Sequence, residues 1–324
     1  MTRVSVIIPV RDRRELLAAA LEALEAQTLR DFEVIVVDDG STDGSRELAS
    51  ASLVAGRPVR VFDNPGRGAI AARQFGWEQS RSDLLAFTDS DCEPAPGWLA
   101  ALTAVADAGA DVVAGVTLPA RRPKPLERTM VSTTDSGGYP TCNVLYRRSW
   151  VERVGGFATD ADRTLTFDGG SLARNYGFWE DTLMGWRLRR AGAVPGFAPD
   201  AVVHHHVFAP DLGDLLRRTW MLGSQPSLMK LVPELRATLL NRRVFYQERG
   251  RAMVYVMVIG VALRRRGLAV GALGVWAAAR LRRHLAEGTG IGESIAALPV
   301  ELVVDGILTA ALVRGSLAAR TVVL

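Results

Sequence analysis

The sequence predicts an α/β protein with a mostly parallel central sheet flanked by helices, followed by a helical C-terminal region. Short β-branched runs alternate with longer amphipathic patterns through the first 115 residues. The runs are almost continuously apolar, which is typical of parallel strands covered on both faces. After about residue 210 the pattern changes to apolar helical stretches separated by arginine clusters.

The expected elements follow from these patterns in chain order. Strands are expected at 4–10, 32–39, 59–62, 83–89, 111–116 and 201–208. Helices are expected at 14–27, 43–55, 69–77, 96–108 and 181–192. The stretch 116–173 is irregular, with a basic, proline-broken segment at 120–128 and glycine pairs at 137–138, 155–156 and 169–170. Long loops of this kind are usually lids or substrate surfaces.

Composition limits the class of protein. The 324 residues can form one large domain with an appendage, and 48% hydrophobic residues with a mean hydropathy of +0.11 exclude a disordered chain. Charge is uneven, because residues 211–324 hold 16 Arg/Lys and 8 Asp/Glu whereas residues 1–210 hold 23 and 27. This split predicts a neutral-to-acidic catalytic or binding domain and a basic C-terminal region that binds anions.

The cysteine content and the N-terminal sequence bear on where in the cell the protein lies. Cys92 and Cys142 are the two cysteines and form no CxxC motif, so we expect ordinary thiols in a reducing compartment. The opening MTRVSVIIPV runs straight into an expected strand without the pattern of a signal peptide. We therefore expect a cytoplasmic protein, peripheral on the cytosolic face of a membrane.

Charged and polar side chains follow four of the expected strands. Ligands of such sheets bind beyond the carboxyl ends of the strands, so these residues predict one shared site. Each alone could cap a helix or line a turn, as Asp43 does at a helix start. The residues, strand by strand, are Arg11 and Asp12; Asp38, Asp39 and Ser41; Asn64, Arg67 and Arg73; and Asp89 and Asp91.

The stretch FTDSDCEP places Asp89 and Asp91 one residue apart at a strand end. On an extended backbone residues i and i+2 point the same way, so the two carboxylates could share one cation. Oxygen ligands suit Mg²⁺ or Mn²⁺. A solvated turn is the alternative, because D-x-D also occurs by chance in loops.

NPGRGAIAARQ is a turn followed by a helix, and its amides with Arg67 and Arg73 suit a diphosphate. The same stretch fits the dinucleotide fingerprint at Gly66, Gly68 and Ala71. We disfavour that interpretation, because the preceding strand is short and carries a charge, and because a dinucleotide enzyme needs no D-x-D pair.

Glu180 and Asp181 open the expected helix at 181–192. Acidic residues stabilise the positive end of a helix, which is the structural interpretation. The functional interpretation is a general base that takes a proton from an acceptor hydroxyl.

Six blocks carry a family resemblance from Val4 to about His206. They are VSVIIPVRDRRELLAAALEALEAQ, VIVVDDGSTDGS, NPGRGAIAARQFG, FTDSDCEP, GGF at 155–157 and WEDTLMGWRLRRAG. In order and spacing the chain resembles a family 2 glycosyltransferase of the GT-A fold, which is Rossmann-like. The resemblance implies transfer of a sugar, hexosyltransferase-like, from a nucleoside diphosphate sugar to an acceptor hydroxyl with inversion.

The resemblance also implies roles for single residues. It implies Asp181 as general base, and a divalent metal, Mn²⁺ or Mg²⁺, at Asp89, Asp91 and His205. His205 matches best, although His204 and His206 share the opposite face of a strand. Acceptor contacts are expected at Glu180, Asn143 and Trp179. Nucleotide-sugar contacts are expected at Pro9, Arg11, Asp38, Asp39, Ser41, Arg67, Arg73, Asp89 and Ser90.

Two positions depart from the family pattern. Gln74 follows Arg73 where the family commonly has Asn, and Arg11 stands where many members have an aromatic residue that stacks on the base. A guanidinium group can stack as well. We expect a UDP-sugar as donor, but the second departure makes another nucleotide more plausible.

The expected domains are 1–210, with a nucleotide-sugar half at 1–115 and an acceptor half at 116–210, and a basic helical region at 211–324. Apolar runs in that region are short or contain Pro299, Glu301 and Asp305, so none convincingly spans a membrane. Glu301 and Asp305 share one helical face. The pattern favours helices lying on an anionic membrane surface; core helices or a homo-oligomer contact are alternatives, and nucleic acid is not expected.

Together these observations predict an inverting, metal-dependent glycosyltransferase. Its acceptor would be a glycan or a lipid-linked molecule in cell-envelope, polysaccharide or glycolipid synthesis. The alternatives are a sugar nucleotidyltransferase, for which a second activating cation site is missing from the sequence, and a non-catalytic subunit that binds nucleotide sugar or membrane.

Overall fold

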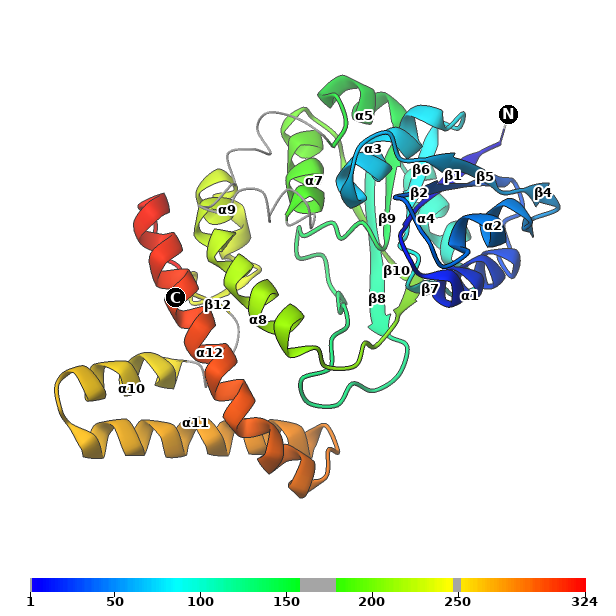
Figure 1. Cartoon of the computed structure of the whole chain (residues 1–324). Helices are drawn as coiled ribbons and strands as arrows, with labels where there is room; N and C mark the ends of the chain where they lie inside the picture. Colours follow the sequence, from blue (N-terminus) through cyan, green and yellow to red (C-terminus); the bar gives the residue numbers. More distant parts are fainter. Residues whose placement is uncertain (1, 158–178, 247–251) are drawn as a thin grey trace. The chain divides into compact units, whose positions relative to one another are not determined.

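A computed structural model describes residues 2–157, 179–246 and 252–324 of the chain (Figure 1). It divides into two compact units, one of Met1–Arg121 with Thr129–Val207 and one of Arg122–Arg128 with Phe208–Leu324. The second unit thus begins near the expected boundary at 210. It also takes in 122–128, which the sequence did not predict. The expected glycine pair at 169–170 lies outside the described residues.

The first unit is built on an eight-stranded sheet with the order β5-β2-β1-β6-β9-β8-β10-β7. Strand β1 pairs in parallel with β2 and β6, β2 with β5, and β8 with β10, whereas β9 and β7 pair antiparallel with their neighbours. A separate β3–β4 pair stands beside this sheet. The strands are β1 Val4–Val10, β2 Phe32–Asp38, β3 Leu53–Val54, β4 Arg57–Pro58, β5 Arg60–Asp63, β6 Leu84–Phe87, β7 Cys92–Pro94, β8 Val112–Pro119, β9 Val144–Arg147 and β10 Pro195–His205.

The helices of this unit agree with the expected positions to within a few residues at most ends. They are α1 Arg14–Glu25, α2 Ser45–Ser50, α3 Gly68–Gln79, α4 Trp98–Asp107, α5 Arg148–Val154 and α7 Glu180–Arg190. The sequence missed β3, which falls inside the helix expected at 43–55, and also β4, β7, β9 and α5. The last two lie in the stretch expected to be irregular, where the apolar runs are too short to show a period.

Helices cover both faces of the sheet, as the continuous apolar strands predicted. Leu21 of α1 and Leu102 of α4 join one core with the side chains of alternate strand residues such as Val6. Helix α3 covers the opposite face, where Gly76 lies against Ile7 (Figure 1). A Cβ at position 76 would stand 2.6 Å from Ile7 Cγ2, so glycine allows this close packing.

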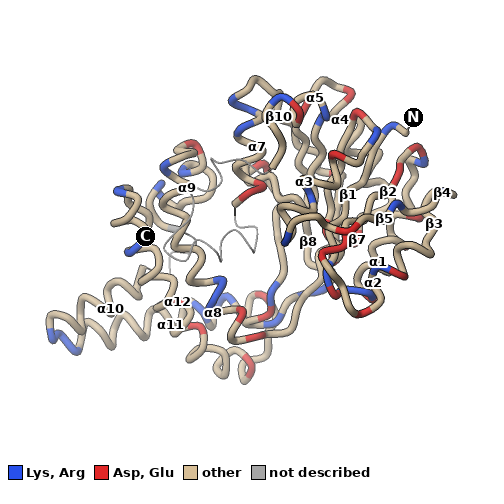
Figure 2. The backbone as a smooth tube through the Cα atoms, turned by 45° about the horizontal axis from the view of Figure 1, so that its top comes forward, with Lys and Arg blue, Asp and Glu red and all other residues tan. Residues whose placement is uncertain are grey.

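The second unit is mostly helical. Helices α10 and α11 form a hairpin, and the turn between them carries Arg264 and Arg265 (Figure 2). Helix α12 packs against α8, α9 and α11. The elements are α8 Leu212–Met221, η2 Leu222–Ser224, α9 Gln225–Leu231, η3 Pro233–Arg236, β11 Leu240–Asn241, β12 Phe245–Tyr246, α10 Ala252–Ala262, α11 Arg266–Ala286 and α12 Ile291–Ala319.

Asn143 holds three elements together and is not an acceptor residue, contrary to the sequence-based expectation. Its side chain is fully buried. The amide Nδ2 donates to the carbonyls of Val116 in β8 (2.8 Å) and Ala201 in β10 (2.9 Å), and Oδ1 accepts from Trp98 Nε1 of α4 (2.8 Å). Three bonds occupy the amide, which leaves it no surface for a ligand.

Replacing Asn143 by Ala should therefore destabilise the protein, because it leaves two carbonyls and one indole N–H buried without partners. We expect the free energy of unfolding to fall by about 3 kcal/mol or more, measured by urea denaturation. A variant of normal stability with a raised KM for the acceptor would contradict this assignment.

Candidate active site

The D-x-D residues follow β6, but the chain turns there instead of continuing extended. The amide of Cys92 donates to the carbonyl of Asp89 at 3.1 Å, which closes the turn. The expectation that the two carboxylates share one face of an extended strand is therefore wrong. Asp89 and Asp91 instead contact different partners.

Asp89 belongs to a buried network centred on Arg73 of α3. Arg73 donates to Asp89 Oδ1 at 2.7 Å and to Glu180 Oε1 at 3.0 Å, and the residue is only 5% exposed. Burial alone would lower the pKa of Arg73, but the carboxylates of Asp89 and Glu180 outweigh it and raise the pKa. The guanidinium therefore stays charged and ties α3 to the D-x-D turn and to the start of α7.

The two acids at the start of α7 have raised pKa values. Burial, and then the neighbouring Asp181, raise the pKa of Glu180 to about 8. Burial also raises the pKa of Asp181 to about 6, although the backbone N–H of Thr182 and the charge of Arg73 oppose the shift. The Thr182 N–H lies 2.6 Å from Asp181 Oδ1 and fixes that carboxylate. A carboxylate with a pKa near neutrality is suited to general-base work.

Trp179 enters the helix in the left-handed conformation, with φ of 69°. For a residue with a bulky side chain this conformation costs on the order of 1–2 kcal/mol. Strain of this kind gathers at functional sites, where the surrounding structure holds it. Trp179 and Glu180 directly precede Asp181 in the chain, and Glu180 is bonded to Arg73; their expected contact with the acceptor stays a prediction.

Asp91 lies beside His205, the last residue of β10, with 3.7 Å between Asp91 Oδ1 and His205 Nε2. His205 Nδ1 lies 2.7 Å from the carbonyl of His206. A carbonyl only accepts, so Nδ1 donates to it, and Nε2 is the ring nitrogen that faces Asp91. A carboxylate and an imidazole nitrogen fit Mn²⁺, so this pair could hold a metal. Of the three candidate histidines, His205 reaches Asp91.

Cys92 also lies within 4.8 Å of the possible ligand atoms of Asp91 and His205. Its side chain is fully buried among apolar residues. A hydrogen bond with Cys142, and then burial, raise the pKa of the Cys92 thiol. Since the thiolate is the form that binds metal, Cys92 is a poor ligand.

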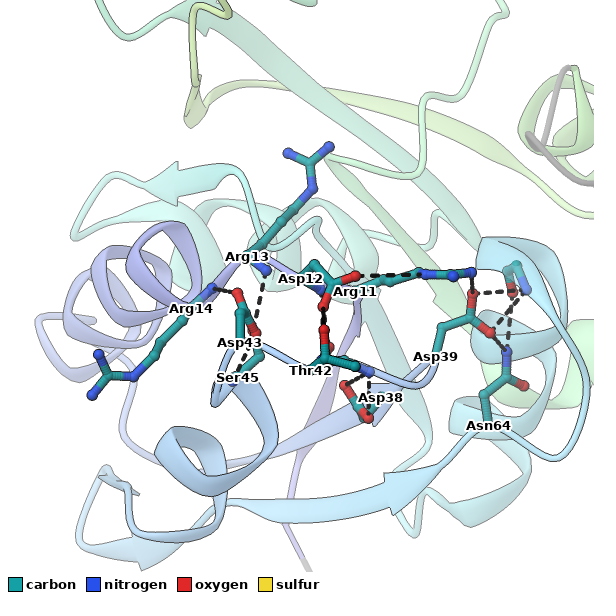
Figure 3. A network of polar contacts seen from close by, with 12 residues as sticks. Arg11, Asp12, Arg13, Arg14, Asp38, Asp39, Thr42, Asp43, Ser45 and Asn64 are labelled. Atoms are coloured by element: carbon teal, nitrogen blue, oxygen red, sulfur yellow. Dashed lines mark hydrogen bonds and ion pairs between the residues drawn. The ribbon is translucent and has the colours of Figure 1, made fainter.

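A second polar network lines the rim between β1, β2 and α3 (Figure 3). Asp39 accepts from Asn64 Nδ2 at 2.7 Å and from the Gly68 amide at 2.9 Å, and Arg11 NH1 lies 3.6 Å from it. The first amide of α3, expected to meet a diphosphate, is thus bonded to Asp39. The side chain of Arg11 is 65% exposed.

The other residues that were expected to contact the nucleotide sugar differ in how exposed they are. Asp38 is 3% exposed and accepts from the Ser41 amide, and Ser90 is 4% exposed, so both support turns. Pro9 is partly exposed and Arg67 is exposed at the start of α3. The Ser41 hydroxyl accepts from the Asp12 amide at 3.0 Å.

Arg13 was not predicted from the sequence as a site residue, and Gln74 was noted only as a departure from the family pattern. Arg13 NH1 lies 2.9 Å from Asp91 Oδ2, and Gln74 Oε1 accepts from the amide of Phe157 at 2.8 Å. Gln74, which departs from the family pattern, thus anchors α3 to the GGF block. For Arg13 a signal existed, because a cation at a helix start opposes the helix dipole and calls for a compensating partner.

The fold is that of GT-A glycosyltransferases. A mannosyltransferase of Pyrobaculum calidifontis, in complex with GDP-Man and Mn²⁺, aligns with a TM-score of 0.55 and 21% identity over 98% of this chain and 87% of its own. Staphylococcus aureus TarS 1–349, in complex with UDP-GlcNAc, aligns with a TM-score of 0.51 and 15% identity over 98% and 92%. Residues 5–159 match the model for Glycosyl transferase family 2.

Residues 5–159, just under half of the chain, are therefore similar to glycosyltransferase family 2. Glycosyltransferase AglE of Haloferax volcanii is 34% identical over 51% of this chain and 64% of its own length. An undecaprenyl-phosphate 4-deoxy-4-formamido-L-arabinose transferase of Pseudomonas aeruginosa is 40% identical over 35% of each chain. The alignments thus span less than two thirds of either relative.

The raised pKa of Glu180 has a consequence for stability. Folding raises this pKa from 4.5 to about 8, so the stabilisation is complete below about pH 4.5 and is lost as the pH rises through about 8. Relative to Glu180→Gln, the wild-type free energy of unfolding should fall between about pH 5 and pH 8. Urea denaturation across this range tests the effect, and parallel curves for the two proteins would contradict it.

Proposed function

We propose that this chain is an inverting glycosyltransferase that moves a sugar from a nucleoside diphosphate sugar, a UDP-sugar first, to an acceptor hydroxyl. The observation that carries the proposal is the link from Asp89 of the D-x-D turn through Arg73 to the acids that open α7. It puts a permanent cation and a base with a pKa of about 6 in one network. The two solved neighbours are in complex with GDP-Man and with UDP-GlcNAc, which supports a nucleotide-sugar donor.

The residues divide the work between leaving group and acceptor. Asp181 is largely ionised at neutral pH and can take the acceptor proton as the oxygen attacks the anomeric carbon. Attack opposite the leaving group inverts that carbon, so no second nucleophile is needed. Arg73, held charged by two acids, opposes the negative charge that grows on the departing diphosphate.

Asp91 and His205 are the residues that would hold a divalent metal, Mn²⁺ or Mg²⁺. When bound, such an ion supplies Lewis-acid stabilisation of the diphosphate. Asp89 forms an ion pair with Arg73. We assign Asp91 as the firmer ligand of the D-x-D pair, because its Oδ1 lies 3.7 Å from His205 Nε2.

The proposed acceptor is a lipid-linked or envelope glycan. The support is the name of the P. aeruginosa relative, which is an undecaprenyl-phosphate transferase. Work on lipid-linked acceptors would place the protein at a membrane, on its cytosolic face.

The Asp181→Asn variant tests the mechanism. It should bind a nucleoside diphosphate like the wild type but lose transfer by about 100-fold or more. Wild-type kcat/KM should fall below about pH 6, because protonation removes the base. Isothermal titration and a sugar-transfer assay give the two quantities.

Other results would redirect the assignment. Unchanged turnover by Asp181→Asn would remove Asp181 as the base. Pyrophosphate release from a nucleoside triphosphate and a sugar phosphate would show a nucleotidyltransferase. Nucleotide binding with no turnover in the wild type, across a panel of acceptors, would indicate a non-catalytic subunit.

We further propose that the second unit binds an anionic membrane surface through the α10–α11 hairpin. Eight large aliphatic side chains between Val258 and Val275 are 39–70% exposed. So much adjacent apolar surface is unusual on a soluble protein. Arginines stand at the turn, at 264–266, and near the end of α11, at 280, 282 and 283. An apolar surface with basic ends matches an anionic lipid interface.

Helix α12 bears on the same proposal. It is 29 residues long with a mean hydropathy of 1.9 over its most apolar window, and by length and composition it could cross a membrane. Two of its three acids, Glu301 and Asp305, face α11, where Asp305 accepts from Trp276 Nε1 at 2.8 Å and from Arg280 at 2.6 Å. Glu301 lies 3.1 Å from His284 Nε2. The charges that argued against an apolar environment are thus paired within the unit.

Charges placed on the hairpin test the membrane proposal. Val261 and Val270 are 70% and 68% exposed, so Val261→Glu/Val270→Glu should fold normally. It should lose most co-sedimentation with vesicles rich in phosphatidylglycerol, and binding by the wild type should weaken with added salt. Leu53→Glu, at a site 66% exposed in the first unit, is the matched control. The proposal would be contradicted if the double variant co-sedimented with vesicles as well as the wild type does. It would also be contradicted if the double variant changed from dimer to monomer without a change in lipid binding.

A further inference from the structure

Two consecutive arginines stand at the start of α1, and only the first contacts the D-x-D turn. Arg13 precedes the helix and Arg14 is its first residue. Figure 3 shows their guanidinium groups pointing in different directions, with that of Arg13 directed away from the rim network. Arg13 NH1 lies 2.9 Å from Asp91 Oδ2. The position at the positive end of the helix dipole is unfavourable for a cation, so this pairing compensates a local cost.

The contact puts a cation on the carboxylate proposed to hold the metal. The side chain of Asp91 is 11% exposed, and its other oxygen faces His205 at 3.7 Å. A guanidinium and a divalent ion on one carboxylate would repel each other strongly in such a setting. Full occupancy by a metal therefore requires that Arg13 withdraw or find another anion.

Arg13 is built so that only its side chain needs to move. Its backbone amide donates to Ser45 Oγ at 3.1 Å, which anchors the main chain. The side chain is 30% exposed and long, so it can swing without disturbing the core. A diphosphate bound at the same metal would offer oxygens that an arginine can bind in bidentate fashion.

We propose that Arg13 is the resident counter-ion of the metal site: it occupies Asp91 before the metal binds, yields to the divalent ion, and then binds the diphosphate of the donor. The inference rests on the proposed metal-dependent function. It makes metal and donor binding mutually dependent, because the donor stabilises the displaced arginine and the metal releases it. The protein then holds metal weakly until its donor arrives.

The experiment measures two affinities in the full-length protein. The first is for Mn²⁺ alone, from the electron paramagnetic resonance signal of the free ion. The second is for UDP, and in parallel GDP, by calorimetry at saturating Mn²⁺. The variants are Arg13→Gln, Arg13→Lys, which keeps the charge, and Arg14→Gln, the matched control. Asp91→Asn reports whether Mn²⁺ binds at the proposed place, and thermal unfolding reports whether each variant folds.

The two affinities should change in opposite directions in Arg13→Gln. We expect Mn²⁺ to bind about tenfold more tightly without nucleotide, and the nucleoside diphosphate about tenfold more weakly with Mn²⁺ present. Arg13→Lys should stay near the wild type in its affinity for Mn²⁺, and Arg14→Gln should change neither value. If Arg13 had only a structural role, Arg13→Gln would weaken both the affinity for Mn²⁺ and the affinity for the nucleoside diphosphate.

Unchanged or weaker Mn²⁺ binding by Arg13→Gln would overturn the inference, and so would an unchanged affinity for the nucleoside diphosphate. Failure of the proposed function gives a different pattern. In that case neither the wild type nor Arg13→Gln binds Mn²⁺ in any form, or Asp91→Asn binds it as well as the wild type does.

Discussion

The site depends on one buried guanidinium. Arg73 is 5% exposed and bonds Asp89 on one side and Glu180 on the other. A buried charge without a partner costs several kcal/mol, so the buried guanidinium is stable only with its two partners in place. Because the three residues come from α3, the D-x-D turn and the start of α7, this requirement aligns the donor side of the site with the proposed base.

Two other buried or nearly buried carboxylates of the described residues show the same constraint. Asp91 has Arg13 and His205, and Asp305 in the second unit has Trp276 and Arg280. In the first unit the pairing fixes the groups of the proposed active site. In the second it lets a long apolar helix carry acids at modest cost, which is compatible with the lipid contact proposed for that unit.

Much of the first unit was predictable because its signals are local. The periods of β1, β2, α1 and α4 are regular, and the rule that sites form at the carboxyl ends of strands drew Asp39, Arg73 and Asp89 into one group. The predictions failed where a residue's role depends on distant neighbours. Asn143 was expected to contact the acceptor, but its side chain is bonded to Trp98, Val116 and Ala201. The extended geometry assumed for Asp89 and Asp91 ignored the turn that separates them.

The sequence by itself determined the α/β architecture, the resemblance of residues 5–159 to glycosyltransferase family 2, and which polar residues follow the strands, because hydrophobic period and motif spacing are properties of neighbouring residues. The tertiary structure alone decided how those residues are paired. Arg13 and Asp91 are 78 positions apart, and Arg73 and Glu180 are 107 apart. No local pattern encodes such pairs, since they form only when the folded sheet brings the strand ends within hydrogen-bonding distance.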